Sequence, residues 1–240
     1  QPDLRLTYNS LSGNGLCGVG FGISTMSAIT RVSRTVYYDG CARGVGYDTK
    51  DAYAIDGRRL ILYSGTEGAD GAVYMIENDL NTKITRRGSG AVQYFEMVSK
   101  GVTIRFGSTS DGRQVIGSAI TGWHVDYSVD NHGNCMTYTY ADVDNMKCIT
   151  SIKYGKNVNL QSPLSNIIEF SYEDREDKPS FIIHGKKGRL SKRLNKITCL
   201  TDNKIFRSYE LKYSTPDGVS RLESVRVRGV GAEGELSTTF

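Results

Sequence analysis

The sequence contains little proline and few histidines, and its cysteines lack the close spacing that is typical of zinc sites. Its 240 residues include 4 prolines, 3 histidines and 5 cysteines, with no Cys-x-x-Cys spacing. Structural zinc sites usually need such a spacing, so we expect no metal ion. The odd cysteine count leaves at least one thiol outside any disulfide within the chain. Buried free thiols are the favoured interpretation, and a Cys17–Cys41 disulfide is the alternative.

The chain also lacks an excess of one charge and a long apolar run. Its 30 basic and 26 acidic residues give a net charge of +4. This balance does not indicate nucleic acid or an anionic membrane as a partner. No apolar run approaches the roughly 20 residues of a membrane-spanning helix. No signal peptide is recognisable and the first residue is Gln1, so we expect a processed chain or a piece of a longer protein.

Motifs for catalysis and nucleotide binding are missing. Neither the Gly-x-Ser-x-Gly elbow nor a His-x-x-x-His pair occurs. Gly13, Gly15 and Gly18 follow the order of a dinucleotide-binding loop, but no helical pattern follows them. The residues from 29 to 38 are strand-like instead, which excludes a phosphate loop of this type.

A calcium loop is suggested by Asp142, Asp144 and Asn145, but the rest of its pattern is missing. Met146 and Lys147 stand where an EF-hand needs a further oxygen ligand and a glycine. These polar residues therefore predict a turn between two strands. We expect no catalytic residue, no cofactor and no metal ligand in this chain.

The residues that are abundant predict an antiparallel all-β fold. The sequence has 27 glycines and 15 tyrosines, which suits strands joined by tight turns. Asp56-Gly57 and Lys100-Gly101 lie between alternating apolar residues, and each predicts a hairpin. Val36 to Gly40 is expected to end a strand at a turn. The hairpins are expected to form a large curved sheet or a sandwich.

The stretch from 123 to 140 is the clearest hairpin. Trp123, Val125, Tyr127 and Val129 alternate with polar residues that include Asp126, so one face of the strand is expected to be apolar.

A turn from Asp130 to Asn134 follows that strand, and it includes Gly133, which we expect to adopt a positive φ. Tyr138 and Tyr140 lie on the return strand. Packing across a broad sheet is the favoured role for such tyrosines, and a carbohydrate site made of exposed aromatics is the alternative.

This hairpin resembles the YD unit of bacterial RHS/YD-repeat proteins. The shared order is W…D-x-x-G-N-x-x-x-Y-x-Y, which Trp123, Asp130, Gly133 and Asn134 open and which Tyr138 closes with Tyr140.

The residues from 4 to 31 resemble the opening of the SpvB-type N-terminal domain found in RHS proteins and in the B component of Tc toxins. Gly13, Asn14 and Gly15 form its GNG element, and Phe21 stands where the family usually has tryptophan.

Two later segments continue the resemblance in the same order. The segment IEFSYEDRED carries Glu173, Arg175 and Asp177 at the family's positions, and Ser220 opens its SRL element. Because an arginine can hold carboxylates with a fork of donors, we expect Glu173, Arg175 and Asp177 to form a structural set of ion pairs. A basic run from 186 to 196 follows. The acidic run just upstream favours a solvated hairpin over a nucleic-acid site.

The resemblance implies a structural function. In RHS and Tc-toxin proteins such hairpins wind into a hollow shell around a toxic C-terminal polypeptide. The chain would then be one SpvB-like β domain over residues 1–240 of a secreted, non-catalytic bacterial shell segment. Its partners would be RHS or β-propeller segments of the same polypeptide or a partner toxin component. The isolated chain would self-associate edge to edge or leave an open sheet face. The alternatives are a secreted β-sandwich that binds a glycan or a surface protein, and a hydrolase.

Overall fold

The computed structural model describes the whole chain except residues 25, 161–162, 164 and 230–235. The described residues form 22 β-strands, one four-residue α-helix and one three-residue 3-10 helix. The predicted antiparallel all-β fold is confirmed, since every strand pairing that the structure records is antiparallel.

The chain divides into two compact units. Unit 1 comprises residues 1–25, 138–182 and 187–240, and unit 2 comprises residues 26–137 and 183–186. That residues 1–240 fold as one domain stays a prediction, because two compact units need not fold independently of each other.

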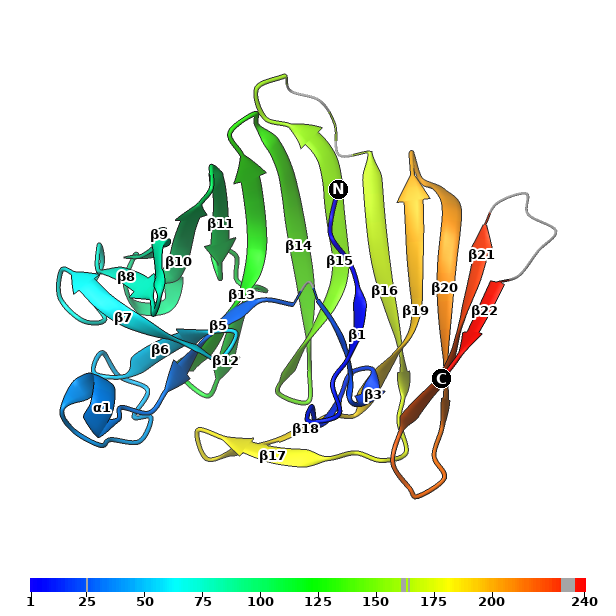
Figure 1. Ribbon diagram of the computed structural model, residues 1–240, viewed down its shortest axis with the longest axis horizontal. Coiled ribbons are helices and arrows are strands. Elements are labelled where there is room, and N and C mark those ends of the chain that lie inside the picture. Colours follow the sequence, from blue (N-terminus) through cyan, green and yellow to red (C-terminus); the bar gives the residue numbers. More distant parts are fainter. Residues whose placement is uncertain (25, 161–162, 164, 230–235) are drawn as a thin grey trace. The chain divides into compact units, whose positions relative to one another are not determined.

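Unit 2 is built around a closed barrel. The strands β5 to β11 follow one another as antiparallel neighbours, and the long strand β13 pairs with both β5 and β11 and so closes the ring (Figure 1). Closure leaves no free edge on the ring. The strands of this unit are β5 (Ala28–Val32), β6 (Ala52–Ile55), β7 (Arg58–Ser64), β8 (Val73–Ile76), β9 (Asp79–Arg87), β10 (Tyr94–Ser99), β11 (Val102–Phe106), β12 (Arg113–Ile116) and β13 (Ala119–Asp130). A 3-10 helix, η1 (Gly90–Val92), precedes β10.

Aromatic rings fill the core of the barrel. Trp123 is fully buried, and its ring centroid lies 5.0 Å from that of Phe95 and 5.7 Å from that of Tyr53. All of these rings meet edge to face, which suits their quadrupoles. The indole Nε1 donates a hydrogen bond to the Gln93 carbonyl oxygen at 3.0 Å.

The prediction that Asp126 lies on a polar strand face is wrong. Its side chain is buried, because the register between β11 and β13 shifts so that Phe106 faces Val125 while Arg105 faces Tyr127. Residue 126 is the extra residue of a β-bulge, which reverses the alternation beyond it. Ser108 and Thr109 donate three hydrogen bonds to its carboxylate, at 2.6 to 3.0 Å. Burial raises the pKa of Asp126, and these hydrogen bonds offset part of that effect.

The segment from 36 to 40 is helical rather than the end of a strand. The helix α1 (Val36–Asp39) is a single turn, capped by the Thr35 hydroxyl, which accepts a hydrogen bond from the Tyr38 N–H at 3.4 Å. Gly40 ends it at a φ of 67°. Two caps around four residues outweigh the strand preference of Val and Tyr.

The predicted hairpin at Trp123 to Tyr140 is present as β13 and β14 (Asn134–Val143). In its turn, one oxygen of Asp130 accepts hydrogen bonds from the backbone N–H groups of His132 and Asn134, each at 2.9 Å. The Asn134 amide donates to the other oxygen of Asp130 at 2.9 Å. Gly133 has a φ of 86°, so its predicted positive φ is confirmed.

Replacing Gly133 with alanine is expected to destabilise the protein by more than about 1 kcal/mol, because a Cβ is strained at this φ. The matched control is Gly13→Ala, since Gly13 has no positive φ and a Cβ there would meet no atom within 4 Å. Urea unfolding of both variants measures the difference. Equal midpoints for Gly133→Ala and the wild type would show that the turn tolerates a side chain.

Unit 1 is built on an open antiparallel sheet. Its strands lie side by side in the order β14, β15, β16, β19, β20, β21 and β22 (Figure 1). After β14 they are β15 (Met146–Asn157), β16 (Asn166–Asp174), β19 (Lys192–Thr201), β20 (Lys204–Ser214), β21 (Arg221–Gly229) and β22 (Leu236–Thr239). The turn predicted at Asp144-Asn145 joins β14 to β15, and both of its residues have positive φ, as in a type I′ hairpin.

Short strands accompany this sheet. They form three two-stranded ribbons: β1 (Leu6–Tyr8) with β4 (Phe21–Ile23), β2 (Asn14–Gly15) with β3 (Gly18–Val19), and β17 (Ser180–Ile183) with β18 (Lys186–Arg189). The N-terminal ribbons bind to the sheet through the backbone, because Val19 N–H donates to the Ser220 carbonyl and Leu194 N–H donates to that of Leu16. The glycine-rich segment therefore forms strands and turns, and the next described element after β4 is the strand β5 rather than a helix.

Candidate functional site

A polar cluster of unit 1 joins three segments that are distant in the sequence. We call it the Arg175 cluster, and it consists of Asn14, Gly15, Arg175, Asp177 and Ser220. The first two residues form β2, Arg175 and Asp177 follow β16, and Ser220 immediately precedes β21. Val19 N–H, which donates to the Ser220 carbonyl at 3.0 Å, holds the N-terminal segment against the start of β21.

The Arg175 side chain is at the centre of the cluster and is fully buried. Its Nε and Nη2 donate to the two carboxylate oxygens of Asp177 at 2.9 and 2.8 Å, which is the bidentate arrangement that a guanidinium prefers. Nη1 donates to the Gly15 carbonyl at 3.0 Å, and Nη2 also donates to the Asn14 side-chain oxygen. The arginine thus ties the N-terminal strands to the end of β16.

Asp177 receives further hydrogen bonds from the other segments. The Asn14 amide and the Ser220 N–H each donate to it at 2.7 Å, and the Ser220 hydroxyl donates as well. Burial alone would raise the pKa of Asp177, but the hydrogen bonds from Arg175, Ser220 and Asn14 outweigh it and hold the pKa well below its usual range. The Ser220 hydroxyl donates a hydrogen bond to a carboxylate that stays ionised, so the geometry suits a structural contact rather than a nucleophile.

Glu173 does not belong to this cluster, contrary to the prediction of a set with Arg175. Its carboxylate pairs with Arg193 at 2.6 Å, because Glu173 lies directly opposite Arg193 in the register of β16 and β19. Arg175 lies beyond the end of β16, and its guanidinium donates to Asp177 and to the Gly15 carbonyl instead.

The remaining predicted motif residues lie at other places. Trp123 is in the barrel core of unit 2, and Asp130, Gly133 and Asn134 form the turn of the β13–β14 hairpin. Tyr138 and Tyr140 are buried in unit 1, at 8% and 7% exposure. This burial favours packing over a carbohydrate site for these two tyrosines. Of the motif residues, the structure therefore brings Asn14, Gly15 and Arg175 into one cluster and joins Asp130 to Asn134 in the hairpin turn.

One buried ion pair was not predicted. Arg31 Nη1 lies 2.9 Å from the Asp51 carboxylate in unit 2, with side-chain exposures of 6% and 1%. The Arg31 Nε donates to the Ile120 carbonyl at 2.8 Å. The alternation of β5 could have placed Arg31 on the same face as Ile29, but no local pattern identifies Asp51 as its partner.

The comparisons with known proteins bear on the fold. No family model and no curated protein sequence matches the chain. Among solved structures, the N-terminal domain of the effector protein SpvB from Salmonella typhimurium strain LT2 superposes with a TM-score of 0.79 at 18% identity, over 95% of this chain and 94% of that one. The chain has the fold of the SpvB N-terminal domain.

Tc toxin structures share this SpvB-type fold in one part of a much longer chain. TcdB2-TccC3 matches with a TM-score of 0.78 and 15% identity, over 98% of this chain but 15% of that chain. The Photorhabdus luminescens Tc holotoxin pore matches with a TM-score of 0.75 and 16% identity, over 94% of this chain and 14% of that chain. The fold implied by the sequence resemblance is therefore confirmed.

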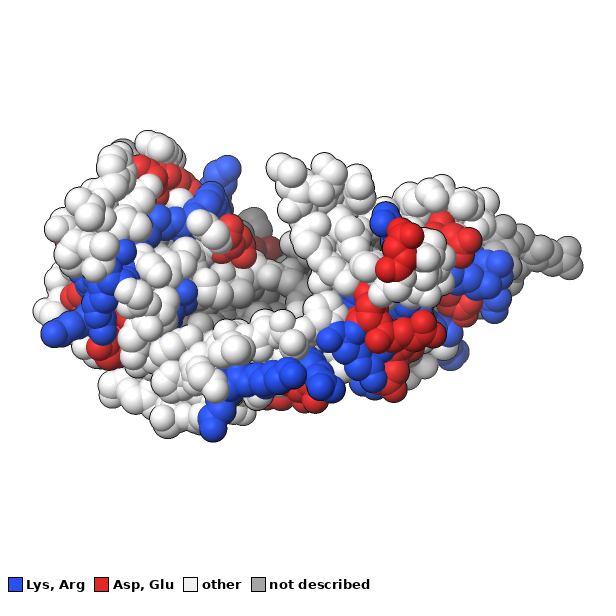
Figure 2. Space-filling view, turned by 90° about the horizontal axis from the view of Figure 1, so that it is seen from below, with Lys and Arg blue, Asp and Glu red and all other residues white. Residues whose placement is uncertain are grey.

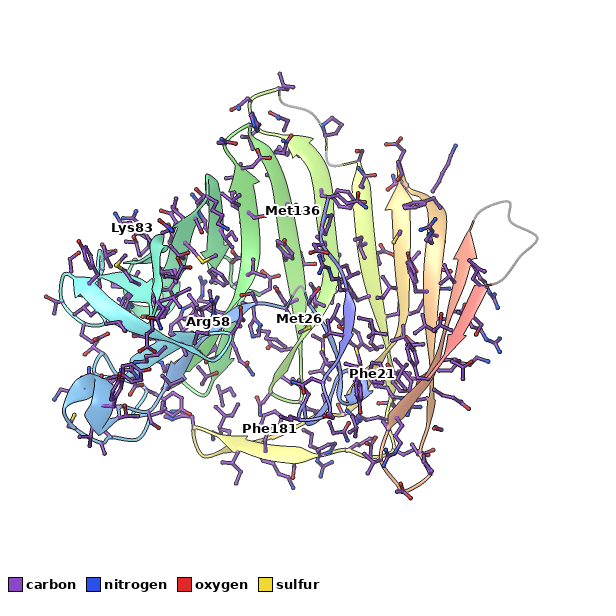
Figure 3. The ribbon with its side chains drawn as sticks, in the orientation of Figure 1. Phe21, Met26, Arg58, Lys83, Met136 and Phe181 are labelled. Carbon is purple, nitrogen blue, oxygen red and sulfur yellow. The ribbon has the colours of Figure 1, made fainter. Side chains whose placement is uncertain are left out.

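Phe21, which stands where the sequence resemblance implies a tryptophan, packs against other aromatic rings. Its centroid lies 4.9 Å from that of Tyr8 and 5.1 Å from that of Phe240. Figure 3 labels Phe21 among the side chains of the chain. These rings line a cavity of about 940 Å³ together with Val225 and Val227 of β21. The phenyl ring keeps the apolar contact without an indole N–H that would need an acceptor.

The cysteines of this chain form no disulfide, and all five are free. Cys17 is buried while Cys41 is exposed, so the alternative of a Cys17–Cys41 disulfide is wrong. Burial raises the pKa of Cys17 to about 12 and that of Cys148 to about 11. Both thiols are thus protonated at neutral pH and poor nucleophiles.

The described part of the chain contains no group of three or more His, Cys, Asp or Glu side chains that could hold a metal ion. Within the same residues, no helix is long and apolar enough to cross a membrane. Basic and acidic side chains are interspersed on the face shown in Figure 2, so that face does not present a wide area of one sign.

The acid sensitivity of the Arg175 cluster gives a testable prediction. Because the pKa of Asp177 is lowered in the folded state, its contribution to stability is present above the unfolded value of about 3.9 and is lost as the pH falls below it. The gap in unfolding free energy between wild type and Asp177→Asn should be largest above about pH 5 and shrink towards pH 2. Urea titrations across this range measure the gap. A gap that does not change with pH would contradict the lowered pKa.

Proposed function

We propose that this chain is a structural, non-catalytic wall segment of a secreted bacterial toxin shell of the Tc or RHS type, which encloses a toxic polypeptide. The likeness to TcdB2-TccC3 supports this proposal, because nearly all of this chain corresponds to a small part of that much longer chain. The Arg175 cluster and the aromatic barrel core stabilise the folded segment within such a wall. The partners are further strands of the same polypeptide or of a partner toxin component.

The single observation that carries the proposal is the open edge at β22. Among the described residues, β22 pairs only with β21, and all four of its residues are exposed. An unprotected edge strand is a template for pairing with another strand. A wall segment needs such an edge, because the wall continues from it.

The geometry of β22 identifies the backbone groups that would make this continuation. Phe240 N–H donates to the Glu223 carbonyl at 2.9 Å, so it points towards β21. In an antiparallel ladder, alternate residues point their N–H groups to the same side. The N–H groups of Ser237 and Thr239 therefore point to the free edge, where a following strand would accept their hydrogen bonds.

Limited proteolysis of the polypeptide encoded by the whole natural gene, with its toxin partner if separate, tests the proposal. An enclosed toxic segment is expected to resist protease until the shell unfolds. Ser237→Pro removes one outward N–H without touching the pairing with β21, so this variant should release the segment earlier. Ser237→Ala keeps the N–H and is the matched control. Immediate digestion of every toxic segment in the wild type would reject the shell role.

A second candidate function is a secreted binding module, and the cavity beside Phe21 favours it. Tyr8 and Phe240 line this cavity and are exposed at 64% and 59%, as aromatics that stack on sugar rings are. A glycan array with the wild type and Tyr8→Ala tests this function. Reproducible binding that is lost in Tyr8→Ala would support the module, and no binding to any glycan would exclude this form of it.

A further inference from the structure

The ribbon of β1 and β4 in unit 1 has one edge that no described strand covers. Among the described residues β1 pairs only with β4, and all three residues of β1 are exposed. At one end of the ribbon, Asn9 N–H donates to the Gly20 carbonyl at 2.9 Å. At the other end, Ser24 N–H donates to the Arg5 carbonyl at 3.0 Å. Both ends are therefore hydrogen-bonded pairs of one antiparallel ladder.

These end pairs fix the direction of the backbone groups between them. In an antiparallel ladder, residues whose N–H and C=O groups point to the partner strand alternate with residues whose groups point away. Arg5 and Asn9 point to β4, so Thr7, midway between them, does so too. The N–H and C=O groups of Leu6 and Tyr8 consequently point to the uncovered edge. They offer two donors and two acceptors to a further strand.

The side chains of this edge face an apolar cavity. Leu6 and Tyr8 are two residues apart, so their side chains lie on the same face of β1, and both line the cavity of about 940 Å³ beside Phe21. Its lining also includes Val225 and Val227 of β21. A second cavity of about 250 Å³ shares Leu6 and Val225 with the first, so the apolar lining continues beyond it. The larger cavity is within the range of ligand sites, roughly 300–1,000 Å³.

The edge and the cavity together specify the chemistry of an occupant. A strand added to the edge of β1 would continue the ribbon. Its side chains at every second position would lie on the same face as those of Leu6 and Tyr8, towards the cavity. The charged side chains of the lining are Arg221 and Glu223, one of each sign, so uncharged side chains suit it. On the other face, beside the exposed Thr7, polar side chains would meet solvent.

We propose that the edge of β1 binds an extended peptide segment of a partner polypeptide, with apolar residues at every second position. Backbone hydrogen bonds to Leu6 and Tyr8 hold the segment, and the cavity selects its apolar side chains, as in other cases of strand addition. A sugar could stack on the Tyr8 ring, but it has no ladder of backbone groups to match the edge. The site lies at a different edge from β22. It therefore goes beyond the proposed shell function, and its test does not depend on that function.

Amide hydrogen exchange of the 240-residue chain, followed by NMR, tests the edge directly. In the free chain, the amides of Leu6 and Tyr8 should exchange faster than that of Thr7, whose N–H points to β4. The probe is the acetylated and amidated peptide KTVTVTK, whose valines alternate with threonines. Its binding should slow the exchange at Leu6 and Tyr8. The control peptide KTTVVTK has the same composition and charge but adjacent valines, so it should bind at least about 3-fold more weakly.

Two variants of one residue separate the backbone from the side chain. Leu6→Pro removes an outward N–H and leaves the hydrogen bonds to β4 in place. Leu6→Ala also loses the leucine side chain but keeps the N–H. Leu6→Pro should therefore bind KTVTVTK about 3- to 10-fold more weakly than Leu6→Ala. Fluorescence anisotropy of the labelled peptide measures both affinities, and urea midpoints show whether both variants are folded.

The exchange measurement decides the outcome even if Leu6→Pro does not fold, because it uses the wild type. Slower exchange at Leu6 and Tyr8 with KTVTVTK, together with weaker binding of KTTVVTK, supports the site. Equal affinities for the two peptides would overturn the proposal, as would no binding of KTVTVTK up to about 1 mM. Binding of a glycan but of neither peptide would also overturn it, in favour of the glycan-binding module.

Discussion

Replacing Arg175 with methionine is expected to destabilise the protein by about 3–5 kcal/mol. The side chain is fully buried and holds both oxygens of Asp177. Removing one partner of a buried ion pair leaves the other charge unmatched, which is the costly case. The substitution also removes the donor to the Gly15 carbonyl, so the N-terminal strands lose one of their ties to the sheet.

Arg5→Met is the matched control for this prediction. Arg5 and Asp3 form an ion pair at 2.8 Å, but their side chains are 69% and 71% exposed. Exposed pairs contribute at most about 1 kcal/mol, so this variant should unfold close to the wild type. Urea unfolding at pH 7 measures both. If the free energy of unfolding fell no more in Arg175→Met than in Arg5→Met, the Arg175 cluster would not be an important source of stability.

Replacing Trp123 with alanine is expected to cost about 3–5 kcal/mol, because it leaves a large cavity among packed rings. Trp123 is fully buried and meets the rings of Phe95 and Tyr53, and its Nε1 bonds to the Gln93 carbonyl. The alanine variant also leaves that carbonyl without its donor.

Tyr37→Ala is the control in the same unit, because Tyr37 is 82% exposed. Its free energy of unfolding should change by about 0.5 kcal/mol or less. Thermal and urea melts of both variants give the comparison. If Trp123→Ala and Tyr37→Ala had the same melting temperature and urea midpoint, the barrel core would have to be organised around other residues.

The hairpins were predictable because their signals are local. Asp56 and Gly57 are the two central residues of one hairpin turn, and both have a positive φ, of 48° and 79°. The alternation of β13 was predictable only as far as Val125, since the bulge at residue 126 depends on the register against β11. The turn of α1 was missed for a similar reason, because its Thr35 and Gly40 caps compete with residues of high strand preference.

The candidate site was predictable only in part. Asn14, Gly15 and Arg175 were singled out through the family resemblance, which does not say that they touch. Their contact depends on how the N-terminal ribbons reach the end of β16, and this arrangement is set by long-range packing.

Cryo-electron microscopy of the polypeptide encoded by the whole natural gene, with its toxin partner if separate, tests the wall-segment proposal most directly. The account predicts that β22 is paired on both sides, with the Ser237 and Thr239 N–H groups bonded to a neighbouring strand. It also predicts density for a polypeptide inside the wall to which this chain contributes. A complete particle in which the outer edge of β22 faces solvent and no polypeptide is enclosed would contradict the proposed function.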